Sequence, residues 1–426
     1  MTQAPLRREL SLPGAMGVGL GSILGTGAFV ALGLAAGLAG PWVLLAIVLA
    51  GALAMCNGLS SAQLAAVHPV SGGTYTYGYR FLSPLAGFAA GWLFLIAKAA
   101  SCAAAALAFG GLIAWVAGIP GEGEAIVLAG LGSLVLITAA ALAGLRRSSA
   151  INIALVAVTV ASLLLLVAAS SPAIVRNGAS LPWADFDAPG VLEAAALCFV
   201  AFTGYGRIAT MGEEVRKPRR TIPVAIVGTL ACALALYMLV ALAGVSVLGS
   251  AAFASRAEND AAPLLGVADA LGSPPISGVL VAGGATALLA VQLNLVLGLS
   301  RVVLAAGREG DLPGPLAGVR RGVPVAAVLV VAGAVAIAIV PGRLAMAWSL
   351  SAVAVLLYYA LTNAAALRVV EGRFVPRWIS ALGLLACIGL AAFVDPLSWL
   401  WAGGLLAAGL AVRLACRAWP RARGTP

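Results

Sequence analysis

The sequence predicts an all-α membrane protein that crosses the bilayer many times, and three observations predict it. Of the 426 residues, 62% are hydrophobic and only 9% are charged, whereas soluble domains carry about 25% charged residues. The apolar residues form long blocks, such as 41–67 and 221–255, without a single charged side chain, and about 20 apolar residues suffice for a helix to cross a bilayer. The pattern lacks the short alternating segments of a transmembrane barrel, so each block is interpreted as a helix.

Twelve membrane-spanning helices are expected, because polar residues divide the chain into twelve apolar blocks. The block after Arg7 and Arg8 is much longer than a signal-peptide core of about 7–15 residues, so it is interpreted as a retained first helix. The whole chain is expected to form a single transmembrane domain. The expected spans are 12–38, 41–66, 83–117, 124–145, 150–172, 190–212, 222–249, 275–306, 323–341, 344–369, 377–394 and 396–415.

The basic residues predict the orientation, because cytoplasmic loops are enriched in Lys and Arg. With the N-terminus in the cytoplasm, all but five of the 25 Lys and Arg residues fall on the cytoplasmic side. Arg176, Arg256 and Arg343 fall outside, while Lys98 and Arg207 fall within spans. A wrong helix count would scramble this alternation, so we expect both termini in the cytoplasm. A short surface helix, 262–271, is expected in the longest outer connection.

Composition and motifs exclude several classes of protein. The net charge is +10, but the basic residues lie in short loops, so no nucleic-acid partner is expected. The six cysteines are scattered through apolar blocks without a C-x-x-C pair, which predicts neither a metal site nor a disulfide. No phosphate loop, H-E-x-x-H motif or Ser/His/Asp grouping occurs, and the only histidine, His68, lies in a loop. We therefore expect neither an enzyme nor a cofactor.

Two expected spans are unusually rich in glycine and are predicted to be interrupted. In the first span the run is 17–27, with four glycines from Gly17 to Gly25 and a fifth at Gly27, and in the sixth span it is 199–207. Each glycine weakens a helix by about 1 kcal/mol relative to alanine. The backbone groups that a break frees inside a membrane must face a cavity or a ligand.

The alternative interpretation is that these glycines allow close helix packing, since small residues recur every four positions at Gly17, Gly21 and Gly25. The positions of the two runs favour interruption. They occupy corresponding places in two five-helix halves, 12–172 and 190–369, which have opposite topology. Paired interrupted spans of this kind indicate a transporter site, and a freed helix N-terminus suits a carboxylate.

Four motifs, in order along the chain, resemble those of one family. They are Gly21 to Phe29 (G-S-I-L-G-T-G-A-F), His68 to Tyr75 (H-P-V-S-G-G-T-Y), Glu213 to Pro223 (E-E-V-R-K-P-R-R-T-I-P) and Ser300 to Pro313. The chain resembles the amino acid–polyamine–organocation superfamily of permeases. This resemblance implies the leucine-transporter fold, with helices 1–5 and 6–10 as inverted repeats and helices 11–12, at 377–415, outside the repeats.

The resemblance also implies which residues bind the substrate. Those of the first break should bind its carboxylate and amino group, and those of the sixth span should flank the amino group and the side chain. Phe202 is a candidate gate, although ordinary packing is the alternative for both phenylalanines. The residues implied are Ser22, Ile23, Gly25, Thr26, Gly27, Phe199, Val200, Ala201, Phe202, Thr203 and Gly204.

Three further residues are candidates for coupling or gating. Lys98 lies in the third span, where an ammonium costs at least about 2.5–3.5 kcal/mol; it is either a titrating group that couples protons to transport or a structural lysine bonded to carbonyls. Proton-coupled relatives place such a lysine in the fifth helix, where this chain has Thr159. Arg207 follows the sixth-span break and either faces the inner vestibule or packs as a snorkelling arginine.

The absence of acidic residues from the expected membrane core predicts a zwitterionic substrate, because a diamine would require a carboxylate or an aromatic cage. We therefore expect a secondary active transporter of small neutral amino acids that works by alternating access in a bacterial inner membrane. Its partners would be the amino acid, H⁺ as the coupling ion and membrane lipids. The alternatives are an amino acid exchanger, a cationic amino acid or polyamine permease, a transporter-like sensor, or a channel.

Overall fold

The protein is helical throughout the part that the structure describes. The computed structural model describes residues 11–68, 73–144, 149–178, 181, 183, 186–209, 215, 218–320 and 322–422. The helices are α1 (Leu12–Ile23), the π-helix η1 (Gly27–Ala31), α2 (Leu32–Ala39), the 3₁₀-helix η2 (Gly40–Trp42), α3 (Val43–Val67), α4 (Gly73–Phe81), α5 (Pro84–Val116), α6 (Gly123–Leu142), α7 (Ser149–Asn177), α8 (Ala188–Phe202), the 3₁₀-helix η4 (Thr203–Tyr205), α9 (Gly206–Ala209), α10 (Pro218–Leu248), α11 (Ser250–Asn259), α12 (Pro263–Ala270), α13 (Pro274–Arg308), the 3₁₀-helix η5 (Gly314–Ala317), α14 (Val325–Ile339), α15 (Leu344–Arg368), α16 (Arg377–Ala391) and α17 (Pro396–Ala422).

The all-α prediction is confirmed, and so is the polytopic character of the chain. Among the described residues, nine helical stretches are long and apolar enough to cross a membrane. Three shorter apolar helices accompany them: α1, α14 and α16. The expected surface helix 262–271 is present as α12, whereas α11, which precedes it, was not expected.

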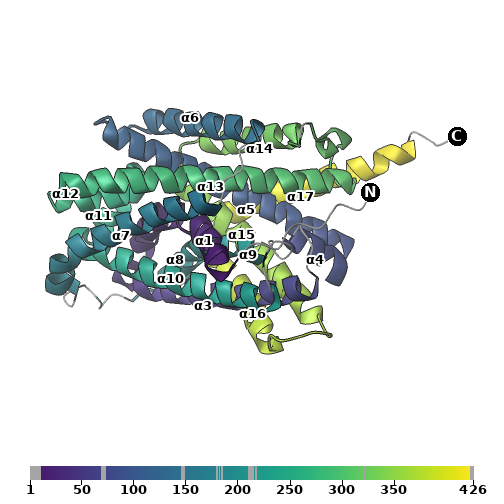
Figure 1. Ribbon diagram of the computed structural model, residues 1–426, viewed down its shortest axis with the longest axis horizontal. Helices are drawn as coiled ribbons and strands as arrows, with labels where there is room; N and C mark the ends of the chain where they lie inside the picture. The colour runs from purple at the N-terminus through teal and green to yellow at the C-terminus, as the bar shows by residue number, and fades with distance from the viewer. Residues whose placement is uncertain are drawn as a thin grey trace.

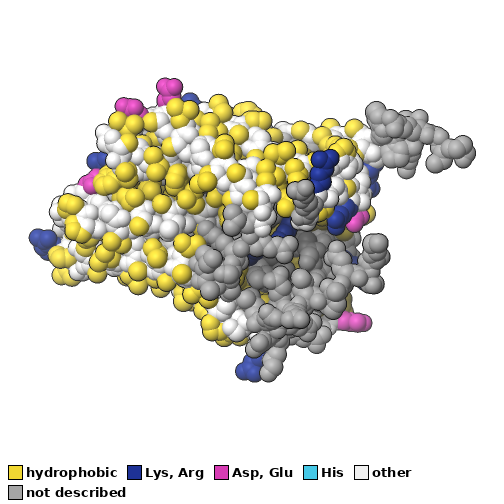
Figure 2. Space-filling view, turned by 45° about the horizontal axis from the view of Figure 1, so that its top comes forward, with side chains coloured by type: hydrophobic (Ala, Val, Ile, Leu, Met, Phe, Trp, Pro, Cys, Tyr) yellow, Lys and Arg dark blue, Asp and Glu magenta, His cyan; other side chains and the backbone are white. Residues whose placement is uncertain are grey.

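The long helices form a bundle in which the interrupted helices occupy the interior. In the bundle α5 packs against α15, α6 and α13, and α3 packs against α8 and α10. Figure 1 shows α11 and α12 at one end of the bundle, and α4 and the end of α17 at the opposite end. On the face drawn in Figure 2, apolar side chains cover the flank and most charged side chains lie near the ends, as expected for a surface that contacts lipid.

Side-chain caps fix where two of the central helices begin. The Ser83 hydroxyl accepts a hydrogen bond of 3.1 Å from the Ala86 amide at the start of α5, and the Asp187 carboxylate accepts one of 3.0 Å from the Gly190 amide at the start of α8. Both caps satisfy an amide that has no partner within its helix. A proline in the first turn of each helix, where no amide donor is needed, reinforces the start.

The first apolar block is interrupted, as the glycine run predicts. Helix α1 ends at Ile23, and Leu24 is extended, with φ −78° and ψ 101°. Leu24 and Gly25 lie outside any helix, and the chain then continues through η1 into α2. The sixth block is interrupted more mildly. Helix α8 ends at Phe202, and η4 leads into the short α9.

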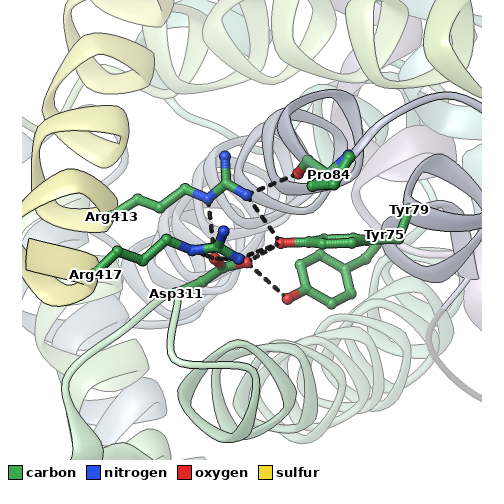
Figure 3. A network of polar contacts seen from close by, with 6 residues as sticks. All are labelled: Tyr75, Tyr79, Pro84, Asp311, Arg413 and Arg417. Carbon is green, nitrogen blue, oxygen red and sulfur yellow. Dashed lines mark hydrogen bonds and ion pairs between the residues drawn. The ribbon is translucent and has the colours of Figure 1, made fainter. Parts of the chain in front are cut away.

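A buried carboxylate ties three distant elements together at the end of the bundle that holds α4 (Figure 3). The Arg413 and Arg417 guanidinium groups of α17 donate to the same Asp311 oxygen, at 2.9 Å and 3.0 Å. The hydroxyl of Tyr75 in α4 donates to the other oxygen at 2.9 Å, and Tyr79 donates to that oxygen as well. Asp311, in the connection after α13, therefore fixes α4 and α17 to that connection.

Candidate functional site

The two interruptions lie directly against each other in the middle of the bundle. A Cβ atom added to Gly204 would lie 2.2 Å from the Ser22 carbonyl oxygen. One added to Gly27 would lie 2.5 Å from the Ala201 Cβ atom. No side chain fits at either distance. Gly204 therefore permits η4 to approach the backbone of α1, and Gly27 permits η1 to approach α8, at distances that any other residue would obstruct. The five predicted residues of the first interruption and the six of the sixth span are thus brought close to one another.

In the first interruption, one side chain has an unsatisfied polar group. The Thr26 side chain is buried, and among the described residues its hydroxyl has no hydrogen-bond partner. The Ser22 hydroxyl, in contrast, donates to the Val18 carbonyl at 2.9 Å within α1. Gly25 faces α13, where an added Cβ would lie 2.5 Å from Val291. Buried polar atoms usually have a partner, so the Thr26 hydroxyl indicates a place for a ligand or a water molecule.

The predicted residues of the sixth span are buried, apart from the partly exposed Gly204, and two of them belong to aromatic pairs. Phe199 contacts Tyr359 edge-on, with ring centroids 5.6 Å apart, and Phe202 contacts Tyr237 in the same way at 5.1 Å. Both phenylalanines are fully buried. Val200 and Ala201 complete the last turn of α8 and are also buried. The structure places Phe202 in packing contact, and its role as a gate stays a prediction.

Lys98 is brought to the sixth-span interruption by α5. Its ammonium donates to the Thr203 hydroxyl at 2.7 Å, and that hydroxyl donates to the Val200 carbonyl at 2.7 Å. The lysine is half-buried. Its partner is therefore a neutral hydroxyl at the point where α8 ends, rather than the backbone carbonyls that a purely structural lysine was expected to use.

Thr159 lies in α7, next to the first interruption. Its hydroxyl donates to the Leu155 carbonyl at 3.0 Å and lies 3.5 Å from the Gly283 carbonyl of α13. A small cavity separates α7, α1 and α13 here. Its lining residues are Gly21, Leu24, Leu155, Val156, Thr159, Ala287 and Ala290. Thr159 therefore borders the first interruption but does not share a contact with Lys98.

Arg207 lies in α9, just after the sixth-span interruption. Two of the four sequence motifs fall partly outside the described residues. These are the loop from His68 to Tyr75, where 69–72 are not described, and the loop from Glu213 to Pro223, where 213, 214, 216 and 217 are not described. Helix α9, which holds Arg207, contacts α1, α3 and α10, and the roles of Arg207 and of both loops stay predictions.

Two tyrosines that no sequence motif indicated also contact the interruptions. The Tyr237 hydroxyl of α10 donates to the Ile23 carbonyl at 2.9 Å and lies 3.2 Å from the Ala201 carbonyl. The Tyr359 hydroxyl of α15 lies 3.4 Å from the Thr203 carbonyl. The one available signal was a tyrosine hydroxyl in the middle of an apolar span, since a buried hydroxyl requires a partner.

This arrangement offers an unpartnered hydroxyl, backbone groups near the end of α1 and an ammonium, all of them inside a bundle of apolar helices. Such groups can hold a small polar solute away from water, as described for interrupted helices that meet inside a membrane bundle. The fold and the site therefore define a membrane transport protein.

The chain belongs to the amino acid permease family of the amino acid–polyamine–organocation superfamily, and the family model matches residues 14–414. An uncharacterised transporter of Mycobacterium tuberculosis is 42% identical, over 95% of this chain and 90% of the relative. The branched-chain amino acid permease BcaP of Bacillus subtilis is 28% identical, over 73% and 69%. The chloroplastic cationic amino acid transporter 9 of Arabidopsis thaliana is 31% identical, over 72% and 56%.

Proposed function

We propose that this permease is a secondary active transporter of small neutral amino acids that works by alternating access. One observation supports the proposal most directly. Gly27 and Gly204 bring the interruptions of α1 and α8 into backbone contact beside the unpartnered Thr26 hydroxyl. A change in this contact would alter both interrupted helices together, which is what a carrier needs in order to open one side and close the other.

In this proposal the chain crosses a bacterial inner membrane twelve times, with both termini in the cytoplasm. Of the three shorter apolar helices, α14 and α16 then each form one span, and α1 forms the first span together with η1 and α2. Helix α1 reaches its partner half, η1 and α2, across the first interruption. Helices 1–5 and 6–10 form the inverted repeats, and bacterial relatives from Mycobacterium agree with the proposed location.

The site chemistry supports a substrate with one carboxylate and one ammonium. Thr26 and the amides freed after Gly25 donate to the carboxylate, and the Ile23 carbonyl accepts from the ammonium. Among the described side chains that contact the interruptions, Lys98 is a cation and none is an acid. A second positive charge on the substrate would be repelled by Lys98, so a neutral side chain is favoured.

Lys98 is the proposed coupling residue. Its bond to Thr203 is charge-assisted while the amine is protonated and is weaker when the amine is neutral, so gain or loss of a proton changes a contact at the end of α8. Protons that move down their gradient would then drive accumulation of the amino acid. Thr159, which occupies the place of the relatives' fifth-helix lysine, cannot titrate and therefore leaves this role to Lys98.

Uptake by purified protein in proteoliposomes tests the proposal. With an acidic exterior, labelled alanine, serine, valine and leucine should accumulate, and collapsing the pH gradient should abolish accumulation. Competition by arginine or putrescine above that by neutral amino acids would indicate a cationic substrate instead. Uptake that occurs only into vesicles preloaded with an amino acid would indicate an exchanger.

A further inference from the structure

We infer that Tyr237 is a positioning residue that holds the two interrupted helices together while the carrier is empty. The inference rests on the proposed transport function and extends it to one step of the cycle, the return of the carrier without substrate. Tyr237 lies in α10, and nothing in the sequence motifs points to it. Its position in the structure, between α1 and α8, suggests the role.

The hydroxyl of Tyr237 has one proton and two acceptors within reach. It donates to the Ile23 carbonyl, the last residue of α1, at 2.9 Å, and lies 3.2 Å from the Ala201 carbonyl near the end of α8. Carbonyls in the last turn of a helix have no partner within that helix. The Tyr237 side chain of α10 therefore lies within hydrogen-bonding distance of carbonyls at the ends of both α1 and α8.

The surroundings hold this hydroxyl in place. A Cβ atom on Gly27 would lie 2.9 Å from the Tyr237 oxygen, so the glycine leaves the room that the hydroxyl needs. The Tyr237 side chain is fully buried, and its ring contacts Phe202 edge-on. Phenylalanine at position 237 would keep the ring and its packing and would remove only the hydrogen bond.

Substrate binding would replace this donor by a better one. In the proposed function the substrate ammonium, which has three N–H donors, approaches the Ile23 carbonyl. The carbonyl is thus satisfied by the ammonium in the loaded carrier and by Tyr237 in the empty one. A buried carbonyl without any donor is costly, so loss of the hydroxyl should penalise the empty carrier during its return across the membrane and should not affect the loaded carrier.

Measurements of net uptake and of exchange distinguish the return of the empty carrier from that of the loaded carrier. Net uptake requires the empty carrier to return across the membrane, whereas exchange between labelled and unlabelled amino acid never requires the empty carrier to reorient. We would compare wild type, Tyr237→Phe and Tyr77→Phe in proteoliposomes. Tyr77, in α4, is the matched control, because its buried hydroxyl has no hydrogen-bond partner among the described residues.

For Tyr237→Phe we expect net uptake to fall about tenfold, the effect of about 1.4 kcal/mol on a barrier, and exchange to stay within about twofold of wild type. Tyr77→Phe should leave both rates unchanged. An equal loss of net uptake and exchange, or no loss of either, would overturn the inference. A wild-type protein that transports no amino acid in either assay would instead refute the proposed function.

A second measurement needs no substrate. Amide hydrogen exchange in the empty protein should become faster at 24–27 and 203–206 in Tyr237→Phe, and stay unchanged there in Tyr77→Phe, because exchange reports local opening. Equal protection of both segments in wild type and Tyr237→Phe would show that the hydroxyl does not hold the helices together, whether or not a substrate is known.

Discussion

The Nζ atom of Lys98 lies 2.7 Å from the Oγ1 atom of Thr203, which joins a charged residue of α5 to the interrupted end of α8. The Thr203 hydroxyl in turn donates a hydrogen bond of 2.7 Å to the Val200 carbonyl, within the last turn of α8. The lysine is therefore connected to the backbone of the candidate site through a single side chain.

Replacement of Lys98 should uncouple transport from protons. Lys98→Gln keeps a polar side chain but cannot take up a proton, and Lys98→Arg keeps the charge but cannot release one. We expect both variants to lose accumulation driven by a pH gradient, by at least about tenfold, while exchange persists.

The control for Lys98 is Thr203→Ser, which keeps the hydroxyl and should retain wild-type coupling. Initial rates of uptake in proteoliposomes at several external pH values provide the measurement. Gradient-driven uptake by Lys98→Gln equal to that of wild type would show that the coupling group lies elsewhere.

Replacement of Thr26 should affect binding without affecting folding. The Thr26 hydroxyl is buried and, within the described part of the chain, forms no hydrogen bond. Removing such a group by Thr26→Val therefore costs no hydrogen bond of the empty protein. We expect an unchanged or slightly higher melting temperature and a rise in KM for amino acid uptake of at least about tenfold, the effect of losing one hydrogen bond to a charged group.

Thr26→Ser keeps the hydroxyl and serves as the matched control, for which uptake close to wild type is expected. If Thr26→Val transported with wild-type KM, the hydroxyl would not contact the substrate.

Replacement of Gly204 by alanine should disrupt the contact between the interruptions. The added Cβ would lie 2.2 Å from the Ser22 carbonyl oxygen, which belongs to the backbone and cannot swing aside. We expect a loss of about 1–3 kcal/mol of stability from overpacking and loss of transport. Thermal unfolding in detergent and uptake in vesicles measure the two effects.

Gly298→Ala is the matched control for Gly204→Ala. Gly298 lies in α13, and an added Cβ there has nothing within 4 Å. Alanine should stabilise this helix by up to about 1 kcal/mol and leave uptake unchanged. A Gly204→Ala protein that resembles this control would contradict the close approach of α1 and α8.

Asp311 should make the stability of the protein depend on acidic pH. Burial alone would raise the pKa of Asp311, but hydrogen bonds from Tyr79, Arg413 and Tyr75 outweigh it, and the pKa lies below its ordinary value. Because the folded-state pKa is depressed, the stabilisation is complete above the ordinary value of about 3.9. It is lost as the pH falls through the lower folded-state pKa.

Asp311→Asn should remove this dependence together with the ion pair. The Asp311 side chain is fully buried and that of Arg413 is only 8% exposed, so breaking the pair leaves a buried guanidinium and should cost about 3–5 kcal/mol. Arg417 is 46% exposed, and Arg417→Gln should cost less than about 1 kcal/mol. Melting temperatures between pH 3 and pH 7 test this, and equal pH profiles for wild type and Asp311→Asn would contradict it.

Local features of the sequence were sufficient to predict the helices and the positions of the two interruptions. An apolar block determines a helix in a membrane whatever surrounds it, because the backbone must satisfy its own hydrogen bonds. Glycine weakens a helix wherever it stands, so the runs around Gly25 and Gly204 already marked the places where α1 and α8 end. The order of the motifs along the chain was likewise sufficient to indicate the family.

Only the tertiary structure decided which distant side chains meet. Tyr237 and Ile23 are 214 residues apart in the chain, and Arg413 and Asp311 are 102 apart. Lys98 was recognised from the sequence as a charge inside a span, but Thr203 as its partner was not. A helix that is apolar on all its faces has no sequence pattern to show which face contacts which neighbour. Packing of the whole bundle therefore determines which of its few polar groups lie next to each other.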